Sequence, residues 1–348
     1  MTYTTSTFSL TAALRGSINS LQRDLARGQK ELSTGRHADP GVALGAQTSR
    51  SFALASTQSE VASIRSTNKL VAARLEATQT ALGNLLDGAR SMRATLLAAQ
   101  TDGGEPSAIV TQARGALSTV VATLNGSDGE AFLFAGVNSN VAPLENYFAN
   151  PPGSSKRAVD AAFAATFGIA QDDPAVGALT RAQIENFLNG PFEQLFTPTQ
   201  WRADWSKASD EPLHSRIAIS MTVDASVSAN EKAFRQLATA YTMIADLGAQ
   251  RMSKPAYHAV LETAMQTIDA SIDALTRTKA RVGATQASIE TADAAMAIQS
   301  ETLELQRNAL EGIDQTQAAA RLKEIMAQTE MAFTLTARIS QLTLAKYL

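Results

Sequence analysis

Apolar residues recur at helical spacing near both ends of this chain. Near the N terminus they stand three, four or seven residues apart, at Leu10, Leu14, Ile18, Leu21, Leu25 and Leu32. Near the C terminus a seven-residue repeat passes into a three/four spacing, at Ile268, Leu275, Val282, Ile289, Met296, Leu303 and Leu310, and then at Ile325, Ala332, Leu335, Ile339 and Leu342. Each series falls on one narrow stripe of a helix, which needs a partner to cover it. The pattern therefore predicts helices that assemble, within the chain or between copies.

A third stripe predicts one long coiled-coil helix in the first third of the chain. Its positions alternate steps of three and four, at Val61, Ile64, Asn68, Val71, Leu75, Thr78, Leu82, Leu85, Ala89, Met92 and Leu96. Asn68 and Thr78 are polar interruptions of this seam. Such residues either fix the register of the paired helices or face a hydrated patch, and both readings stay open here.

Turn-forming residues divide the N-terminal half into further elements. The first helix should run from about Ser9 to Leu32 and close at Gly35, and Asp39-Pro40 reads either as the cap and first residue of a new helix or as a simple loop. A helix from about Ser107 to Leu124 should return antiparallel to the long one. The alternating segment 131–136 predicts a short strand within a hairpin.

The pattern changes between residues 146 and 223, where prolines cluster and no long helix period persists. One helix should begin at Thr180, whose spacing to Gln183 is that of a capping box. A strand with one buried face is expected at Ile217, Ile219, Met221 and Val223.

Helix resumes after this insertion. Ser228 and Glu231 have the spacing of a second capping box, before a helix that should last to Leu247 and close at Gly248. Beyond Lys254-Pro255 helix dominates. We therefore expect a mainly α fold, in which long N- and C-terminal helices pair as a coiled-coil stem and a small α+β domain is inserted in the middle.

Composition agrees with long helices and argues against several classes of function. Hydrophobic residues make up 45% of the chain but aromatic residues only 5%. The net charge of -3 and the lack of a basic stripe make nucleic acid an unexpected partner. Cysteine is absent, which excludes disulfides and thiolate chemistry. Neither a Sec-type signal peptide nor a membrane-inserted segment is expected.

Side chains with catalytic or binding potential are few. His37, His214 and His258 lack the partner three or four residues away that a helical metal pair needs, so we expect no metal and no cofactor. No nucleophile, phosphate-loop or dinucleotide motif is present, so we expect no enzyme. Trp201 and Trp205 are either the core of the insertion or an aromatic surface that binds a glycan.

Four segments give the chain a resemblance to a known family. They are Gln29 to Arg36 (QKELSTGR), Phe132 to Pro143 (FLFAGVNSNVAP), Arg281 to Gln286 (RVGATQ) and the C-terminal Leu335 to Leu348, which ends in Tyr347-Leu348. Residues 5–145 and 225–348 resemble the flagellin family, and most closely its branch at the hook-filament junction, hook-associated protein 3. The Tyr-Leu ending is similar to that of the junction branch, and the opening lacks the Ile-Asn-Thr-Asn of filament flagellins.

The resemblance implies a structural protein of the bacterial flagellum, exported unfolded by a type III apparatus and extracellular after secretion. Residues 1–38 and 312–348 would be terminal arms, disordered in the monomer and ordered as an inner coiled coil in the polymer. Residues 39–145 and 225–311 would form a helical stem with a β-hairpin, and 146–224 an outward α+β domain. Its implied partners are further copies of itself, hook-associated protein 1 on the hook side, flagellin on the filament side and an export chaperone.

Two sets of residues are the ones we expect to carry this function. Polymerisation through the arms is assigned to Leu10, Leu14, Ile18, Leu21, Leu25, Leu335, Ile339, Leu342, Tyr347 and Leu348. The stem coiled coil is assigned to Val61, Ile64, Val71, Leu75, Leu82, Ile268, Leu275, Val282, Ile289, Met296 and Leu303. The alternatives are a filament-forming flagellin and a surface glycan-binding module that uses the two tryptophans.

Overall fold

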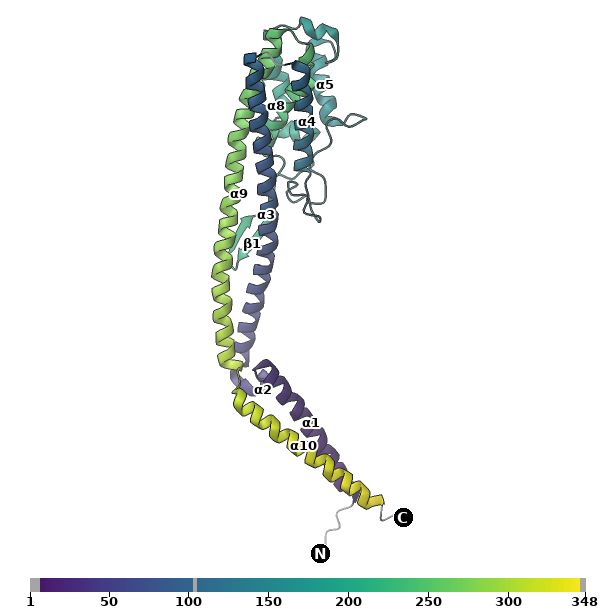
Figure 1. The fold of residues 1–348 in the computed structure, drawn as a ribbon, viewed down its shortest axis with the longest axis vertical. Coiled ribbons are helices and arrows are strands. Elements are labelled where there is room, and N and C mark those ends of the chain that lie inside the picture. The colour runs from purple at the N-terminus through teal and green to yellow at the C-terminus, as the bar shows by residue number, and fades with distance from the viewer. Residues whose placement is uncertain (1–6, 103–104, 345–348) are drawn as a thin grey trace. The chain divides into compact units, whose positions relative to one another are not determined.

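The structure of this protein is a computed structural model that describes residues 7–102 and 105–344. Helices dominate it, as the apolar spacing predicts (Figure 1). The long ones are α1 (Thr7–Thr34), α3 (Thr48–Asp102), α4 (Pro106–Leu124), α8 (Lys232–Asp246), α9 (Lys254–Glu311) and α10 (Gln315–Leu344). Between α1 and α3 lie the short α2 (Pro40–Leu44) and a 3-10 turn, Gly45–Gln47. Within the described residues, no helix has the length and apolarity needed to cross a membrane.

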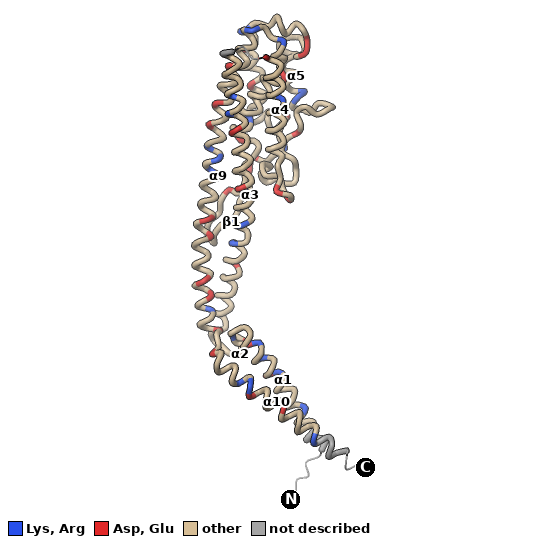
Figure 2. The backbone as a smooth tube through the Cα atoms, viewed as in Figure 1, with Lys and Arg blue, Asp and Glu red and all other residues tan. Residues whose placement is uncertain are grey.

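The chain divides into two compact units, which we describe separately. The first unit comprises residues 1–63 and 296–348, and the second comprises residues 64–295. The first contains α1, α2 and α10 with the adjoining ends of α3 and α9, and here α1 lies along α10 (Figure 1). The second holds the rest of α3 and α9 with everything between them. Positive and negative side chains are interspersed along α3 and α9 (Figure 2).

The apolar seam of α3 lies at the centre of the core of the second unit. Leu75, Leu82 and Met92 of α3 are fully covered, and so are Ile268 and Leu275 of α9. Polar contacts between the two helices flank the apolar seam. Arg65 forms an ion pair with Asp293 at 3.0 Å, and the side-chain amide of Gln79 donates a hydrogen bond to the carbonyl of Lys279 at 2.9 Å. The apolar cluster continues without a break from these helices into the insertion.

The insertion contains more helix than its sequence indicates. Besides α6 (Arg181–Phe187), which begins at the expected Thr180 capping box, it holds α5 (Ser154–Phe167), α7 (Pro198–Asp204), a 3-10 turn (Pro174–Ala178) and a π turn (Leu188–Phe192). The expectation of one helix was wrong because α5 is short and rich in alanine, and buries only Ser155, Val159 and Phe163.

Three local predictions in the insertion and the segments next to it were wrong. Segment 131–136 makes isolated bridges only, because Phe134 turns into the core and packs edge-on against Phe234. The residues expected as one strand form a hairpin of β1 (His214–Ala218) and β2 (Met221–Asp224), turned at Ile219, which is exposed. Ser228 and Glu231 form no capping box, because the Ser228 hydroxyl donates to the carbonyl of Ser209 at 2.6 Å.

Candidate functional site at the base of the stem

Two glycines shape the backbone where the terminal helices meet the long ones. Gly35 ends α1 in the left-handed conformation, with φ of 69°. Gly312 follows α9, and a Cβ there would lie 2.4 Å from the carbonyl oxygen of Asn308, closer than any real side chain approaches. The two turns are bonded together: the amide of His37 donates to the carbonyl of Glu311 at 2.9 Å, and that of Ile313 donates to Gly35 at 3.1 Å. The N-terminal and C-terminal connections are therefore one structure.

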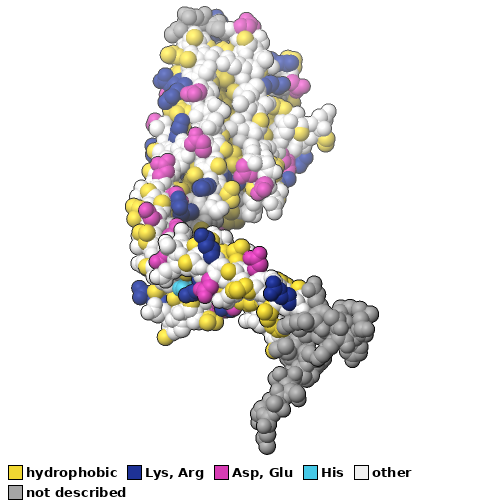
Figure 3. All heavy atoms as spheres, turned by 60° about the horizontal axis from the view of Figure 1, so that its bottom comes forward, with side chains coloured by type: hydrophobic (Ala, Val, Ile, Leu, Met, Phe, Trp, Pro, Cys, Tyr) yellow, Lys and Arg dark blue, Asp and Glu magenta, His cyan; other side chains and the backbone are white. Residues whose placement is uncertain are grey.

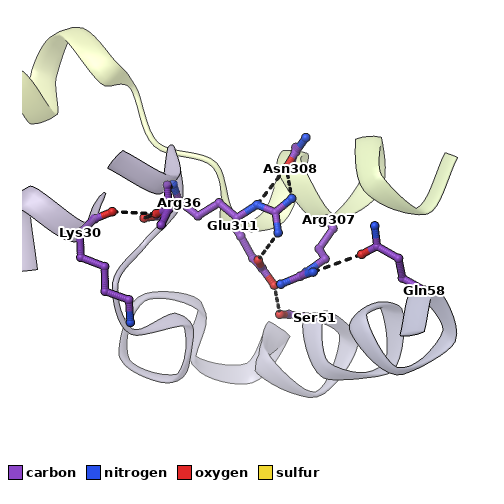
Figure 4. Close-up of polar contacts among 8 residues, drawn as sticks. Lys30, Arg36, Ser51, Gln58, Arg307, Asn308 and Glu311 are labelled. Carbon is purple, nitrogen blue, oxygen red and sulfur yellow. Dashed lines mark hydrogen bonds and ion pairs between the residues drawn. The ribbon is translucent and has the colours of Figure 1, made fainter. Parts of the chain in front are cut away.

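Glu311 is the centre of this region, as a carboxylate whose side chain is only 3% exposed. The Ser51 hydroxyl donates to its Oε1 at 2.5 Å, and Nε of Arg307 donates to the same oxygen at 3.1 Å. A third group, Nη1 of Arg36, lies 3.5 Å from Oε2 (Figure 4). A buried carboxylate is costly unless it is paired and hydrogen-bonded, and here both conditions are met.

The electrostatics follow from these contacts. Burial on its own raises the pKa of Glu311, but the hydrogen bonds from Ser51 and Arg307 and the charges of Arg307 and Arg36 lower the pKa overall. Glu311 is therefore held ionised, and its charge keeps the two arginines in place.

Arg36 connects the end of α1 to the end of α9. Its Nε and Nη2 both donate to Oδ1 of Asn308, at 3.1 and 2.6 Å. Nη1 of Arg307 donates in turn to Oε1 of Gln58 on α3, at 3.1 Å. We call these six residues the base cluster: Arg36, Ser51, Gln58, Arg307, Asn308 and Glu311. It ties together three chain segments through planar, directional groups, which favours a fixed geometry.

The connection between α1 and α3 is held by a second group of bonds. Nζ of Lys30 donates to the carbonyl of Ala38 at 3.0 Å, and Oε1 of Glu31 accepts from the amide of Ala38 at 3.1 Å. Asp39 caps α2 by accepting from the amide of Val42 at 3.2 Å, with Pro40 at the first helical position. The helix reading of Asp39-Pro40 is thus confirmed, although the helix is only one turn long.

The arms, defined as α1 and α10, pack along each other but bury little. A Cβ on Gly28 of α1 would lie 3.0 Å from Cδ1 of Leu322 on α10, so the two backbones approach closely. Within residues 12–34 and 315–338, the side chain that reaches the buried class is that of the polar Thr329. Four apolar side chains of α10 are about half exposed or more: Met326, Met331, Phe333 and Leu335. Figure 3 shows apolar side chains on the surface of this part of the molecule.

The residues assigned to polymerisation fall on these arms. Leu14, Ile18, Leu21 and Leu25 are partly covered, whereas Leu335 is exposed because Thr336 takes the next inward position after Ala332. Leu10, Ile339 and Leu342 lie on the arm helices, but their side chains are outside the described part, and Tyr347 and Leu348 lie outside the described residues altogether.

The residues assigned to the stem seam lie between α3 and α9. Fully or almost fully buried are Val61, Ile64, Leu75, Leu82, Ile268, Leu275, Val282, Ile289 and Met296, while Val71 and Leu303 are partly covered. Val61, Met296 and the partly covered Leu303 belong to the first unit, and Val61 and Met296 are its only buried apolar residues among those described. The core of the described protein is therefore almost wholly in the second unit.

Asn68 has a role that neither sequence reading anticipated. It is buried in the seam, and its Nδ2 donates to the carbonyl of Ile217 in β1 at 3.0 Å. It therefore attaches the β-hairpin to α3. Thr78, the other polar residue in the seam, donates only to the carbonyl of Arg74 in its own helix, at 3.0 Å.

The tryptophans are core residues, so the glycan-binding alternative loses its surface. Trp201 is 0% exposed and Trp205 is 3% exposed, and their rings stack 5.0 Å apart. Trp205 stacks in turn on Tyr147. Among the described residues, no group of three or more His, Cys, Asp or Glu side chains is placed to hold a metal ion.

The base cluster itself was not predicted from the sequence. Arg36 is the last residue of the QKELSTGR segment, and Arg307 and Glu311 have the i, i+4 spacing of a helical ion pair, which is a usable signal. Ser51 carries no such signal, because its partner is 260 residues away in sequence. The polar groups of the base cluster bind one another across three segments of the chain, as in a structural clamp.

Comparison with known proteins gives matches at both ends of the chain. The model of the bacterial flagellin N-terminal helical region matches residues 5–139, and the model of the bacterial flagellin C-terminal helical region matches residues 265–348. Together these ranges contain both arms, the whole of α3 and α4, and most of α9. The base cluster therefore lies entirely within the matched regions.

A solved structure shares the fold. It is described as a flagellar hook-associated protein from Vibrio parahaemolyticus, and it is similar to this chain with a TM-score of 0.51 and 12% sequence identity. The likeness covers 77% of this chain and 99% of that one. No curated protein matches the chain.

Proposed function

Because the chain belongs to the bacterial flagellin family by the match of both its terminal helical regions, we propose that it polymerises through its arms as the adaptor of the hook-filament junction. Family membership makes it a structural, non-enzymatic component of the flagellum that assembles with itself. The adaptor role is the finer step, and it needs its own support.

The observation that carries polymerisation is the near absence of a core in the first unit. The arms bury no apolar side chain among those described, yet they carry a full apolar stripe and further exposed apolar residues. Burying one leucine-sized side chain contributes about 1.5–3 kcal/mol, so a surface of this kind gains stability when it is covered. Neighbouring copies of the same arms are the partner that the family provides.

The distribution of these residues on α10 favours a ring or tube over a closed dimer. Met326 and Phe333 are seven residues apart and share one stripe, whereas Met331 and Leu335 share another. Both stripes are exposed, one on each side of the contact with α1. A subunit with two different apolar contact surfaces forms head-to-tail contacts, and such contacts either close into a ring or continue as a helical filament.

Two observations favour the junction over the filament. The chain ends in the Tyr347-Leu348 pair that resembles the junction branch, and its fold is shared with a protein described as hook-associated. The partners that follow are hook-associated protein 1 on the hook side, flagellin on the filament side and an export chaperone before secretion. We also propose the division of labour given by the sequence: arms at 1–38 and 312–348, a stem at 39–145 and 225–311, and an outward domain at 146–224.

A gene deletion examined by electron microscopy tests the adaptor role. Cells without this protein should build hooks of normal length while flagellin is lost to the medium, because the filament has no protein through which to attach to the hook. Complementation with the intact gene should restore filaments. Normal filaments in the deletion strain would remove the proposal.

The second candidate is a filament-forming flagellin, which the same family matches allow. Abundance separates the two. A filament protein should dominate sheared flagella on a stained gel, whereas an adaptor should be a minor band that an antibody finds at the hook-proximal end.

A further inference from the structure

The second unit contains a polar crevice between α8, α9 and the segment 188–198. Its volume is about 420 Å³, within the range of pockets that bind small molecules. The polar side chains that α8 contributes are three or four residues apart, so they lie on one side of that helix. The polar lining residues of the two helices are Lys232, Arg235, Gln236 and Thr239 of α8 and Thr263, Gln266 and Thr267 of α9.

Arg235 brings a positive charge to this crevice without a carboxylate partner. Its side chain is partly buried, and its hydrogen bonds go to the backbone. Nε donates to the carbonyl of Asn230 at 3.2 Å, and Nη1 donates to the carbonyl of Phe196 at 2.8 Å. Among the described residues, none forms an ion pair with this guanidinium. The fold therefore holds Arg235 in place and leaves its charge unpaired.

The charges around Arg235 favour an anion beside it. Burial and the positive charge of Arg202 lower the pKa of Arg235, while Asp210 and Glu231 act in the opposite direction. Both carboxylates pair with other residues, Asp210 with Arg202 and Glu231 with Arg281. An arginine stays protonated in proteins. A protonated group that has lost part of its hydration without gaining a carboxylate is stabilised by a nearby anion.

Two further side chains of α8 in the crevice have no partner. Lys232 is exposed and makes no hydrogen bond or ion pair among the described residues. Oε1 of Gln236 is buried and accepts no hydrogen bond from them, which costs free energy until a donor reaches it. Of the described lining residues Glu193 alone is acidic, so the two cations give the crevice a net positive charge.

We propose that this crevice binds a small organic anion that carries hydroxyl groups. Its carboxylate or phosphate lies against Arg235 and Lys232, which are neighbours on α8 at i and i+3. One hydroxyl of the anion donates to Oε1 of Gln236. The planar guanidinium matches the paired oxygens of a carboxylate or a phosphate, and an anion without hydroxyl groups leaves the buried acceptor of Gln236 unsatisfied.

This site is independent of polymerisation. All its lining residues belong to the second unit, and none belongs to the arms. A bound anion contacts α8, α9 and the segment 188–198, so it should raise the melting temperature of the protein. The adaptor role stands or falls on the gene deletion alone, whatever the outcome of the binding experiments.

Isothermal titration calorimetry and thermal melting of the full-length protein at low ionic strength test the site. Gluconate and hexanoate are matched probes, because both are six-carbon carboxylates and only gluconate carries hydroxyl groups. Glucose 6-phosphate offers a phosphate in place of the carboxylate. At least one of the two hydroxylated anions should bind about threefold or more tightly than hexanoate, and the better one identifies the charged group. If neither binds more tightly than hexanoate, the proposal is wrong.

A charge variant tests the anion contact. Lys232→Gln should weaken binding of the better anion about threefold and should melt like the wild type, because Lys232 has no partner in the described chain. Lys254→Gln is the matched control: Lys254 is likewise the first residue of its helix, exposed and unpartnered among the described residues, but does not line the crevice. Its affinity should equal that of the wild type. Equal losses in both variants would show general attraction by surface charge and contradict the site.

Gln236→Leu tests the hydroxyl contact separately. Leucine removes the unsatisfied acceptor, so the free variant should be as stable as the wild type or more so, while the preference for the better anion over hexanoate should disappear. Arg235→Gln should abolish binding, and its melting curve checks that the variant folds without the two bonds to backbone carbonyls. A preference that survives in Gln236→Leu contradicts the assigned contact, and if Arg235→Gln does not fold, the Lys232 and Gln236 variants decide.

Discussion

Glu311 shows how a single buried charge can organise a connection between helices. Its carboxylate accepts from Ser51 and Arg307 and pairs with Arg36, so three segments depend on one ionised group. Removing one partner of a buried, hydrogen-bonded charge costs more than the bond itself contributes, because the others lose their compensation.

Glu311→Gln should loosen the base of the stem in a pH-dependent way. The fold lowers the pKa of Glu311, so its ionised form stabilises the native state above the unfolded pKa of about 4.3, and that contribution disappears as pH falls through the folded pKa. We expect faster amide exchange at His37 and Ile313 in the variant at neutral pH, by about 1–3 kcal/mol of local opening, and convergence with wild type in acid. Glu301→Gln is the control, because Glu301 is exposed on the same helix and has no partner among the described residues. A difference that persists unchanged below the folded pKa of Glu311 would contradict the role of the charge.

Tyr147 offers a residue-scale test in the core of the second unit. Its buried hydroxyl donates to Oδ2 of Asp246 at 2.7 Å, and Lys156 lies 3.2 Å from the same oxygen. Burial raises the pKa of Asp246, while the Tyr147 and Lys156 contacts act to lower it. Tyr147→Phe should therefore reduce the free energy of unfolding by about 1–2 kcal/mol and raise the pKa of Asp246 further.

Tyr257→Phe is the matched control for that variant. The Tyr257 hydroxyl is buried and has no hydrogen-bond partner among the described residues, so its removal breaks no bond seen here and should leave stability unchanged or slightly higher. Thermal melting of both variants gives the comparison. Equal destabilisation by the two substitutions would show that ring packing, and not the bond to Asp246, sets the cost.

At the scale of elements, the hairpin depends on the long helix. β1 pairs with β2, and the carbonyl of Ile217 accepts from Asn68 of α3, so a helix side chain replaces a third strand. A two-stranded hairpin alone is marginal in water. Asn68 thus interrupts the apolar coiled-coil seam, and its side chain holds the hairpin in place.

Asn68→Leu should separate these two effects. Leucine completes the apolar seam, so the melting temperature of the helical stem should hold or rise, while the carbonyl of Ile217 loses its donor and residues 214–224 should exchange their amides faster. Thr78→Val is the control, because Thr78 bonds only within α3. Unchanged exchange in the hairpin of the Asn68 variant would rule out the anchoring role.

How far the elements could be predicted depended on their length. Seams such as that of α3 repeat over many turns, so the period is unmistakable, and the capping box at Thr180 was confirmed because its two partners are local. The prediction of a strand at 131–136 was wrong because Phe134 packs against Phe234, about a hundred residues away in sequence. Nothing near Phe134 in the sequence indicates that contact. The base cluster was missed for the same reason, as Ser51 and Arg36 find their partners at the other end of the chain.

At the scale of the whole molecule, the arms and the core are separable. Deleting residues 336–348 removes none of the buried core residues described, so the truncated protein should fold and be secreted but should not assemble. Thermal melting, immunoblots of the medium and electron microscopy of flagella check the three parts. Filaments of normal length from the truncated protein would contradict the role of the arms.

The arms should also differ between monomer and polymer. Isolated helix pairs without a buried core are marginal in water, so we expect the helices within residues 1–38 and 312–348 to be disordered in dilute monomer and to gain helix on assembly. The turns at His37 and Ile313, which are bonded to Glu311 and Gly35, should stay ordered. Circular dichroism should show less helix in the monomer than in the polymer, and removal of the arms should abolish that difference. Fully helical arms in dilute monomer would refute this expectation.

The pairing of the first helices with the last has a consequence for when this protein can fold. Ser51 and Glu311 are 260 residues apart in sequence, and Asn68 and Ile217 are 149 apart. α3 is complete at Asp102, yet its partner α9 starts only at Lys254. Contacts this distant in sequence form late, since long loops must close before they are rewarded. Whichever end emerges first from a ribosome or a secretion channel, its apolar seam has no partner helix until most of the chain has followed. The long helices therefore cannot pair early, and the chain remains in the extended state that a narrow channel admits.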